Sequence, residues 1–501
     1  MLATERHADH AREYPYERHR PEETVLHRVV STYWPTFCER VEALGSLPKF
    51  VVRDVDEYLR CGILEQGFIR AQCTNCGFER LVALSCKRRG FCPSCLGRRM
   101  SDTAVWLTEH VIPTVQIRQW VCTLPWELRV RVGYDRTLCA MVSDTFIREL
   151  QRSYRWRAKH ELGLSSVDEA FTGMVTVIQR FDSALRLNVH FHTLVLDGVY
   201  VKDDNGEGVR FLRLPRPSED DVYEVAMRTA KKVQAKLEQR GRTSDSESNG
   251  EGDGEIEPAL AVCYDVAAQA PKKVIGDGHR MGKGEIAVVV DGFNVYAGDA
   301  IDGRDRKRVE RMCRYLARPP IATERLTETG AGYELRYELK KAWRDGTRFV
   351  RLDPYELIAR ICAMVPPPWF NMIRFHGVLA PNAKLREQVV ASARPYVPPQ
   401  ENAVPNPLQL PLFGKEFDEP EADVGHKRRK PWAWLLRHVF AIDVSVCPKC
   451  GGRMKWRQVA LTADAIREGL SRAGLAARGP PKQNRAPFGQ LSLPFPKMRP
   501  A

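Results

Sequence analysis

The sequence lacks any apolar run long enough to cross a bilayer. Its longest apolar runs, such as IAVVV at 286–290, are far shorter than the roughly 20 residues of a membrane-spanning helix. The first residues, MLATERHADHAREYPYERHRPEE, lack the apolar core of a secretory signal peptide. We therefore expect a soluble, intracellular protein without a membrane partner.

Two catalytic signatures are also missing. The sequence has no Gly-rich phosphate-binding loop, which argues against nucleotide hydrolysis, and no paired-carboxylate nuclease motif. Acidic residues are outnumbered, with 63 Asp and Glu against 77 Lys and Arg, and the formal charge of +14 suits a polyanionic partner. A chain of 501 residues predicts two or three domains. In a reducing compartment its 14 cysteines would be available as metal ligands.

Four cysteines have the spacing of a zinc site. CTNC at 73–76 is followed, after fifteen residues, by CPSC at 92–95. This spacing predicts two knuckles that share one tetrahedral ion, with a structural role. The neighbouring Cys61 and Cys86 are alternative ligands, ligands of a second ion, or buried small residues. The predicted zinc ligands are Cys73, Cys76, Cys92 and Cys95.

Basic residues surround the second pair, in CKRRGFC (86–92) and LGRRM (96–100). A basic surface stiffened by a metal suits contacts with phosphates, and a solvated charged face is the alternative. The candidate DNA-binding residues here are Lys87, Arg88, Arg89, Arg98 and Arg99.

A further knuckle, CPKCGGRMKW at 447–456, has no second cysteine pair near it in sequence. Cys447 and Cys450 would borrow a ligand such as His438, bind metal in a dimer, or be the remnant of a zinc ribbon. A complete zinc site here is not the favoured interpretation.

The middle of the chain alternates strand-like and helix-like segments. Apolar patterns predict strands at 117–125, 173–181, 185–197 and 285–293, and helices at 135–160, 219–240 and 305–317. The turn FDSA makes 173–181 and 185–197 hairpin partners. We expect an α+β fold with an antiparallel sheet. Residues 241–257, polar and acidic, predict a disordered insertion.

The strand at 185–197 carries His190 and His192. Residues i and i+2 of a strand emerge on the same face, so both imidazoles face a common point while Phe191 enters the core. An isolated His-x-His is more often a hydrogen-bonded pair than a metal site. Other motifs in the sequence are needed to distinguish a hydrogen-bonded histidine pair from a metal site.

The segment DGRDRKRVERMCRYLARPP (302–320) predicts an amphipathic helix that ends at a Pro-Pro pair. Tyr315 lies near its end, where a tyrosine would ordinarily pack on a sheet. Four arginines nevertheless surround it, which suits a phosphodiester better than a core. They are Arg308, Arg311, Arg314 and Arg318.

Four segments together carry a resemblance. SCKRRGFCPSC, QRFDSALRLNVHFH, RYLARPPIA and FHGVLAPNAKLR, in this order, resemble transposases of the insertion-sequence ninety-one family and its common-region relatives. The resemblance implies an amino-terminal zinc-binding domain, an HUH-type (His-hydrophobic-His) nuclease domain, and rolling-circle transposition of single-stranded DNA. It covers roughly residues 25–390, with a weaker echo around the carboxy-terminal knuckle.

Carried over to this sequence, the resemblance makes His190 and His192 ligands of a catalytic Mg²⁺ or Mn²⁺ and Tyr315 the nucleophile. The products would be a 5′-phosphotyrosine and a free 3′-hydroxyl. Gln179, on the hairpin partner, is the preferred third ligand, and Asp182 and Glu310 are weaker candidates.

The family pattern differs from this chain in one respect. Many members carry two tyrosines four residues apart, whereas the position four before Tyr315 is Arg311, which resembles the single-tyrosine branch. Tyr333 and Tyr337 have the two-tyrosine spacing, but alternation of apolar and charged residues around them predicts a strand. We expect them to pack on a sheet.

The implied architecture divides the chain into six parts. They are a zinc-binding, DNA-contacting domain (25–110), an HUH-type domain (111–350), its extension (351–394), a linker (395–430), a small segment with the CPKC knuckle (431–478) and a disordered tail (479–501). The partners would be single-stranded DNA and the DNA of element ends. The protein would be cytoplasmic and associated with the nucleoid, and an oligomer is possible. A plasmid replication initiator or relaxase, and a non-enzymatic zinc-dependent DNA-binding regulator, are the alternatives.

Overall fold

The computed structural model describes residues 20–203, 205–244, 256–275, 286–329, 334–343, 345–390 and 445–475. The expected linker (395–430) and tail (479–501) lie outside these residues, as do His438 and Tyr333. Of the expected insertion at 241–257, residues 245–255 lie outside them, and residues 241–244 continue a helix.

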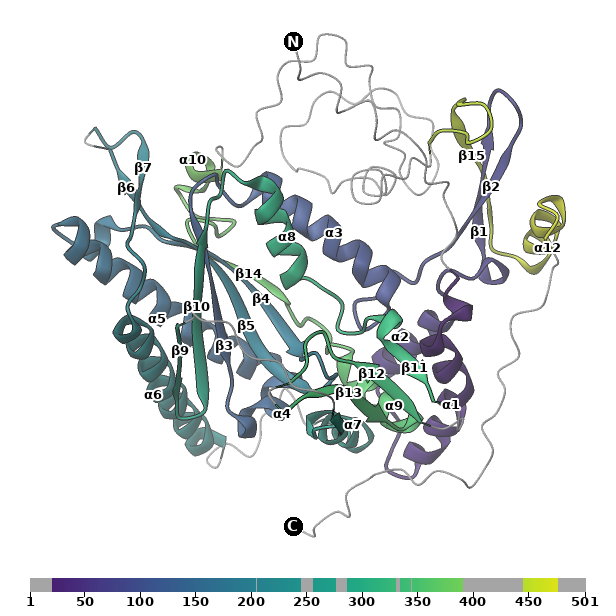
Figure 1. The fold of residues 1–501 in the computed structure, drawn as a ribbon, viewed down its shortest axis with the longest axis horizontal. Coiled ribbons are helices and arrows are strands. Elements are labelled where there is room, and N and C mark those ends of the chain that lie inside the picture. Colours follow the sequence, from purple (N-terminus) through teal and green to yellow (C-terminus); the bar gives the residue numbers. More distant parts are fainter. Residues whose placement is uncertain are drawn as a thin grey trace.

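The centre of the molecule is an antiparallel sheet of order β14-β4-β5-β3-β10-β9 (Figure 1). Its strands are β3 (Ile117–Thr123), β4 (Gly173–Phe181), β5 (Leu187–Leu196), β9 (Ile286–Val290), β10 (Phe293–Ile301) and β14 (Ile373–Gly377). The predicted hairpin of β4 and β5 is confirmed, with Gln179 opposite His190. Asp182 stabilises its turn, accepting hydrogen bonds from the backbone N–H groups of Ala184 (2.9 Å) and Arg186 (3.1 Å).

Helices cover both faces of this sheet, and the predicted α+β class with an antiparallel sheet is confirmed. On one face lie α4 (Trp126–Tyr134), α5 (Arg136–Leu162), α6 (Glu219–Ser244) and α7 (Pro258–Ala268). On the other, α3 (Pro93–His110) packs against α8 (Arg306–Leu316) (Figure 1). Phe191 of β5 is fully buried on the first face, so the histidines on either side of it point to the second.

The amino-terminal helices are part of the main hydrophobic core. α1 (Val25–Glu42) begins at Thr24, whose hydroxyl accepts a hydrogen bond from the His27 N–H at 3.2 Å, and it packs on α9 (Pro354–Met364). Tyr33 and Tyr355 meet edge to face across this contact, 5.4 Å between ring centroids. The expected zinc-binding domain (25–110) and the extension of the catalytic region (351–394) therefore pack together. α2 (Lys49–Arg60) belongs to the same core, whereas α10 (Arg386–Val390) packs in a second cluster with α3 and α8. Short 3-10 turns lie at Pro21–Glu23, Leu64–Gln66, Val167–Glu169 and Thr323–Arg325.

Three smaller sheets surround the centre. β11 (Leu326–Glu328), β12 (Leu335–Glu338), β13 (Thr347–Leu352) and β8 (Lys272–Ile275) form one, and β6 (Gly198–Lys202) with β7 (Val209–Arg213) another. The third has the order β15-β1-β2, from β1 (Phe68–Cys73), β2 (Glu79–Ala83) and β15 (Met454–Ala460). Together with α12 (Ala463–Arg472), it stands at one corner of the molecule (Figure 1). Among the described residues, no helix has the length and apolar character needed to cross a bilayer.

Candidate active site and cysteine clusters

His190 and His192 lie side by side on β5, with their ring centroids 4.8 Å apart. His192 is buried and His190 is partly exposed. Each ring is oriented through its Nδ1 atom. The Nδ1 of His190 lies 2.6 Å from the Asn188 carbonyl, and that of His192 lies 2.7 Å from the amide nitrogen of Gln119 on β3.

Burial disfavours the charged form of both imidazoles. Desolvation lowers the pKa of His190, and it lowers the pKa of His192 to about 2, helped by the charges of His190 and Arg318. Neutral imidazole is the form that binds metal ions. Near neutral pH both rings therefore have the neutral charge that a metal site requires.

Tyr315 reaches the same place from α8. This helix begins at Asp305, whose carboxylate accepts a hydrogen bond from the Arg308 N–H at 3.0 Å, and it buries Val309, Cys313 and Leu316. Tyr315 is 39% exposed, and its ring meets the His192 ring edge-on with 6.0 Å between centroids. The phenol is thus accessible to a large substrate while its ring contacts a buried histidine.

Gln179 joins β4 to the end of α8. Its amide nitrogen donates to the carbonyl of Leu316 at 2.6 Å and approaches that of Tyr315 at 3.4 Å. Because Gln179 is the cross-strand partner of His190, its side chain is on the histidine face. The contact ties the position of the phenol to the histidine-bearing strand.

The weaker candidates for a third ligand are engaged elsewhere. Asp182 pairs with Arg186 at 2.9 Å, and Glu310 pairs with Arg314. Within the described ranges, no acidic residue, cysteine or further histidine gathers with the two histidines as a potential metal cluster. Gln179 is the candidate that lies beside them.

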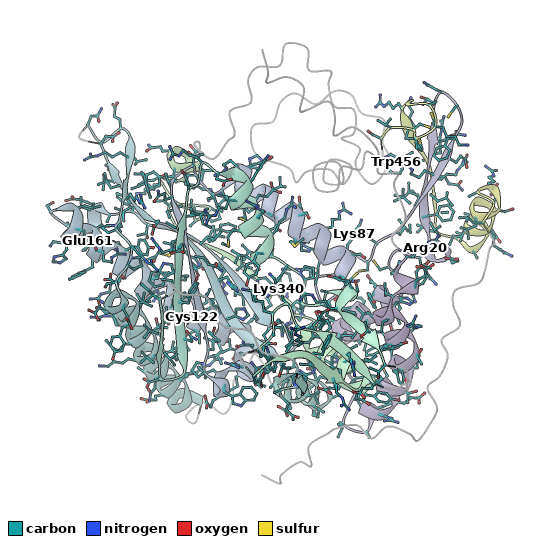
Figure 2. The ribbon with its side chains drawn as sticks, in the orientation of Figure 1. Arg20, Lys87, Cys122, Glu161, Lys340 and Trp456 are labelled. Atoms are coloured by element: carbon teal, nitrogen blue, oxygen red, sulfur yellow. The ribbon has the colours of Figure 1, made fainter. Side chains whose placement is uncertain are left out.

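Two cations lie against the phenol ring. The guanidinium of Arg318 and the ammonium of Lys340 are each 4.8 Å from its centroid. Figure 2 labels Lys340 close to the end of α8. Of the other predicted arginines, Arg314 is in its ion pair, and Arg308 and Arg311 are exposed along the helix.

Sequence reasoning missed Gln119 and Lys340. Gln119 interrupts an otherwise apolar face of β3, two residues from Val121, which lies opposite His192. A polar side chain in that alternating pattern was the available signal. Lys340 follows β12, a strand far from α8 in sequence, and no local pattern connects the two.

The predicted grouping of four cysteines is wrong. The structure separates the pair at 73–76 from the pair at 92–95 and places each in a different cluster of four. The second pair joins Cys61 and Cys86, and the first pair joins the carboxy-terminal Cys447 and Cys450. The physical reason is that β1 and β2 form a hairpin that carries the first knuckle away from α3, where the second pair lies.

The cluster of Cys61, Cys86, Cys92 and Cys95 fits a zinc ion. Thiolates about 2.3 Å from one zinc ion lie about 3.8 Å from each other. The Sγ of Cys95 is 3.6 Å from that of Cys61 and 3.4 Å from that of Cys86, and Cys92 is 3.6 Å from Cys61. Cys92 immediately precedes α3, and Cys95 lies in its first turn.

The basic residues of this region have different environments. The guanidinium of Arg88 is paired with Glu57, with Nε donating to Oε2 at 2.6 Å, so its charge is already partly neutralised within the protein. Lys87 and Arg89 are exposed, and Figure 2 shows Lys87 near the start of α3. Arg98 and Arg99 are partly buried on α3, where Arg99 donates to the Lys87 carbonyl at 3.3 Å.

Two family models match the chain. A model described as a transposase zinc-binding domain matches residues 29–124, and a transposase model matches residues 173–387. The first match contains the cluster of Cys61, Cys86, Cys92 and Cys95, and the second contains β4, β5 and α8. No curated protein and no solved structure matches the chain.

Proposed function

Because the chain belongs to the insertion-sequence ninety-one family of transposases, we propose that it cleaves and rejoins single-stranded DNA at element ends. In this proposal Tyr315 is the nucleophile, and His190 and His192 hold a divalent metal ion. One observation carries it. The histidine strand, Gln179 of its hairpin partner and the tyrosine helix are separate in sequence, yet they meet at one point through the Gln179–Leu316 and His192–Tyr315 contacts.

The partners of the two imidazoles support a role as ligands. A carbonyl accepts but does not donate, so Nδ1 of His190 carries the proton and its Nε2 keeps a lone pair for a metal. His192 would be prepared in the same way when the Gln119 amide turns its oxygen toward Nδ1, an exchange of two nearly isosteric atoms. Gln179 has its nitrogen on the Leu316 carbonyl, which leaves its amide oxygen as the third ligand atom.

The reaction is a transfer of one phosphoryl bond. A bound Mg²⁺ or Mn²⁺ would supply Lewis-acid polarisation of the scissile phosphate. The Tyr315 oxygen loses its proton and forms a bond to phosphorus, while the bond from phosphorus to the 3′ oxygen breaks and that oxygen takes up a proton. The products are a 5′-phosphotyrosine and a 3′-hydroxyl. Attack by a 3′-hydroxyl reverses these changes and rejoins the strand.

Arg318 and Lys340 would bind the substrate at the phenol. Both cations lie beside the ring, and a phosphodiester that reaches the phenol must pass close to them. The exposed Arg308 and Arg311 extend the positive charge along α8. Lys87 and Arg89 near the zinc cluster would contact a more distant part of the element end.

A covalent-adduct assay tests the proposal. Purified protein would be incubated with end-labelled single-stranded element ends and Mg²⁺ or Mn²⁺, and the adduct would be mapped by peptide sequencing. We expect one labelled peptide, containing Tyr315. No adduct and no cleavage with any candidate end would favour the DNA-binding regulator. Cleavage at a plasmid origin in place of element ends would favour the replication initiator or relaxase.

A further inference from the structure

The carboxy-terminal knuckle lies against the amino-terminal one. CTNCG at 73–77 and CPKCG at 447–451 have the same sequence pattern and the same backbone geometry. In each, the glycine N–H donates to the carbonyl of the first cysteine, at 3.2 Å for Gly77 and 2.9 Å for Gly451. Both glycines have a left-handed φ, +73° and +71°. The two segments therefore form a pair of matched turns.

The two turns present their four sulfur atoms to one another. The Sγ atoms of Cys73 and Cys450 are 3.5 Å apart and those of Cys76 and Cys447 are 3.6 Å apart. All four lie within 4.8 Å of one another. These separations are far longer than the roughly 2.05 Å of a disulfide bond and close to the roughly 3.8 Å between thiolates on one zinc ion.

Direct contacts hold the turns in this position. The Thr74 N–H donates to the carbonyl of Arg453 at 3.0 Å, and a Cβ added at Gly452 would lie 2.8 Å from the amide nitrogen of Asn75. The Asn75 N–H also approaches the Cys73 sulfur at 3.4 Å, the kind of contact that stabilises a thiolate ligand. A side chain at 452 would therefore have to displace the Asn75 side chain.

Apart from these contacts, residues 445–475 are joined to the rest of the described chain mainly by one strand pairing and one helix contact. β15 pairs with β1 from Phe68–Ala460 to Cys73–Met454, and α12 rests on Phe68 through Gly469 and Leu470. The buried residues here form two small clusters apart from the main core, Leu64, Phe68, Ala460 and Leu470 in one and Ala71, Cys73, Cys447 and Met454 in the other. Cores of this size rarely hold a fold without a metal or a disulfide.

We propose that a second structural zinc ion joins an amino-terminal and a carboxy-terminal segment of the chain. Its ligands would be Cys73, Cys76, Cys447 and Cys450. The ion would fasten β15 to the edge of the β1–β2 hairpin and make one three-stranded zinc module from segments more than 370 residues apart. The module is separate from the proposed cleavage site, because its buried residues form their own clusters, apart from the one that β4, β5 and α8 share.

Zinc content of the full chain tests this inference. We expect two zinc ions per chain in the wild-type protein, purified under reducing conditions. Cys450→Ser and Cys76→Ser should each leave one ion, and the double variant should also leave one, because the two cysteines bind the same ion. The matched control Cys86→Ser removes a ligand of the other cluster and should also leave one. Combined with Cys450→Ser it should leave none.

Hydrogen exchange gives a readout that does not depend on metal analysis. Cys450→Ser should speed exchange at 68–73 and 454–460 by at least tenfold and leave 187–196 of β5 unchanged. One zinc ion in the wild-type chain, or two in Cys450→Ser, would overturn the proposal. A disulfide between Cys73 and Cys450 or between Cys76 and Cys447 in the reduced-purified protein would do the same.

Discussion

The ring of Tyr315 meets the ring of His192 edge-on, with 6.0 Å between their centroids, although the two residues belong to a helix and a strand that are distant in sequence. The arrangement leaves the phenol at the surface and the imidazole beneath it. A nucleophile and a metal ligand that take part in one reaction need this kind of placement.

Replacing Tyr315 with Phe should abolish the covalent adduct with little loss of stability, because the side chain is partly exposed and keeps its ring contacts. Tyr223→Phe, at a comparably exposed tyrosine of α6, is the matched control and should keep the adduct. The measurement is gel retention of labelled DNA after denaturation. Full adduct formation by Tyr315→Phe would contradict the assignment.

The two tyrosines with the alternative spacing should not be needed. Tyr337 is buried in β12, where its hydroxyl accepts a hydrogen bond from the Ala322 N–H at 3.1 Å. Tyr337→Phe should keep the adduct and lower the free energy of unfolding by about 1–3 kcal/mol, the cost of an unpaired buried N–H. Tyr333→Phe should also keep it. Peptide mapping of a trapped nucleotide to either tyrosine would refute this expectation.

His190→Ala and His192→Ala should abolish cleavage in Mg²⁺ or Mn²⁺ while the affinity for single-stranded DNA changes less than about threefold. Phosphate contacts dominate that affinity, which should fall steeply with salt in wild type and variants alike. Fluorescence anisotropy measures binding, and a nicking assay measures cleavage. Nicking by the double variant would show that the histidines hold no catalytic metal.

Gln179 allows its two possible roles to be separated. Gln179→Glu keeps an oxygen ligand but loses the N–H that donates to the Leu316 carbonyl. If the contact positions Tyr315, cleavage should fall by ~10- to 100-fold, since a displacement of about 1 Å has such effects. Mn²⁺ affinity, measured by calorimetry, should stay equal or rise. Wild-type cleavage by Gln179→Glu would leave the side chain as a ligand without a positioning role.

The stability of the metal-free protein should depend on pH through His192. The folded-state pKa of His192, about 2, lies below the ordinary histidine value of 6.5, so the unfolded chain binds the extra proton. The part of the free energy of unfolding that depends on His192 is fully present above pH ~6.5. It is lost as the pH falls below that value, toward the folded-state pKa. Between pH 7 and 5.5 the loss should be about 1 kcal/mol.

Urea unfolding of the wild type and His192→Leu at both pH values isolates this effect, because other titrating groups are common to the two proteins. On going from pH 7 to pH 5.5, the wild type should lose about 1 kcal/mol more of its free energy of unfolding than His192→Leu. His160→Ala, at an exposed histidine, serves as the control for the loss of a histidine side chain. A pH dependence identical in the wild type and His192→Leu would show that folding does not lower the pKa of His192.

Sequence patterns predicted the parts of the site that depend on local periodicity. Alternating apolar residues predicted β4 and β5, and the turn at Asp182 predicted that these two strands pair. Helical spacing of apolar residues before a Pro-Pro pair predicted α8. Gln119 and Lys340 depend instead on which strands become neighbours. The order β4-β5-β3 brings Gln119 beside His192, and no pattern within β3 specifies that neighbour.

The cysteines show the same limit. Spacing along the chain identified each Cys-x2-Cys pair correctly as a unit, but it could not say which pairs meet. Cys92 and Cys95 are nearer in sequence to Cys76 than to Cys61. The β1–β2 hairpin nevertheless carries Cys76 away, so Cys61 and Cys86 complete their cluster. The partner of the first knuckle comes from the far end of the chain, beyond the reach of any local rule.

Helix α3 would set the distance between two DNA contacts in the proposed function. One end begins at Cys92 and Cys95, beside Lys87, and its length packs against the helix that carries Tyr315. Its 18 residues span about 27 Å. In the proposed function, a zinc ion at the Cys92 end of α3 and the nucleophile on the packed helix would be held at a fixed separation. Lengthening α3 by one helical turn, about 5.4 Å, should then shift the cleavage position along the strand.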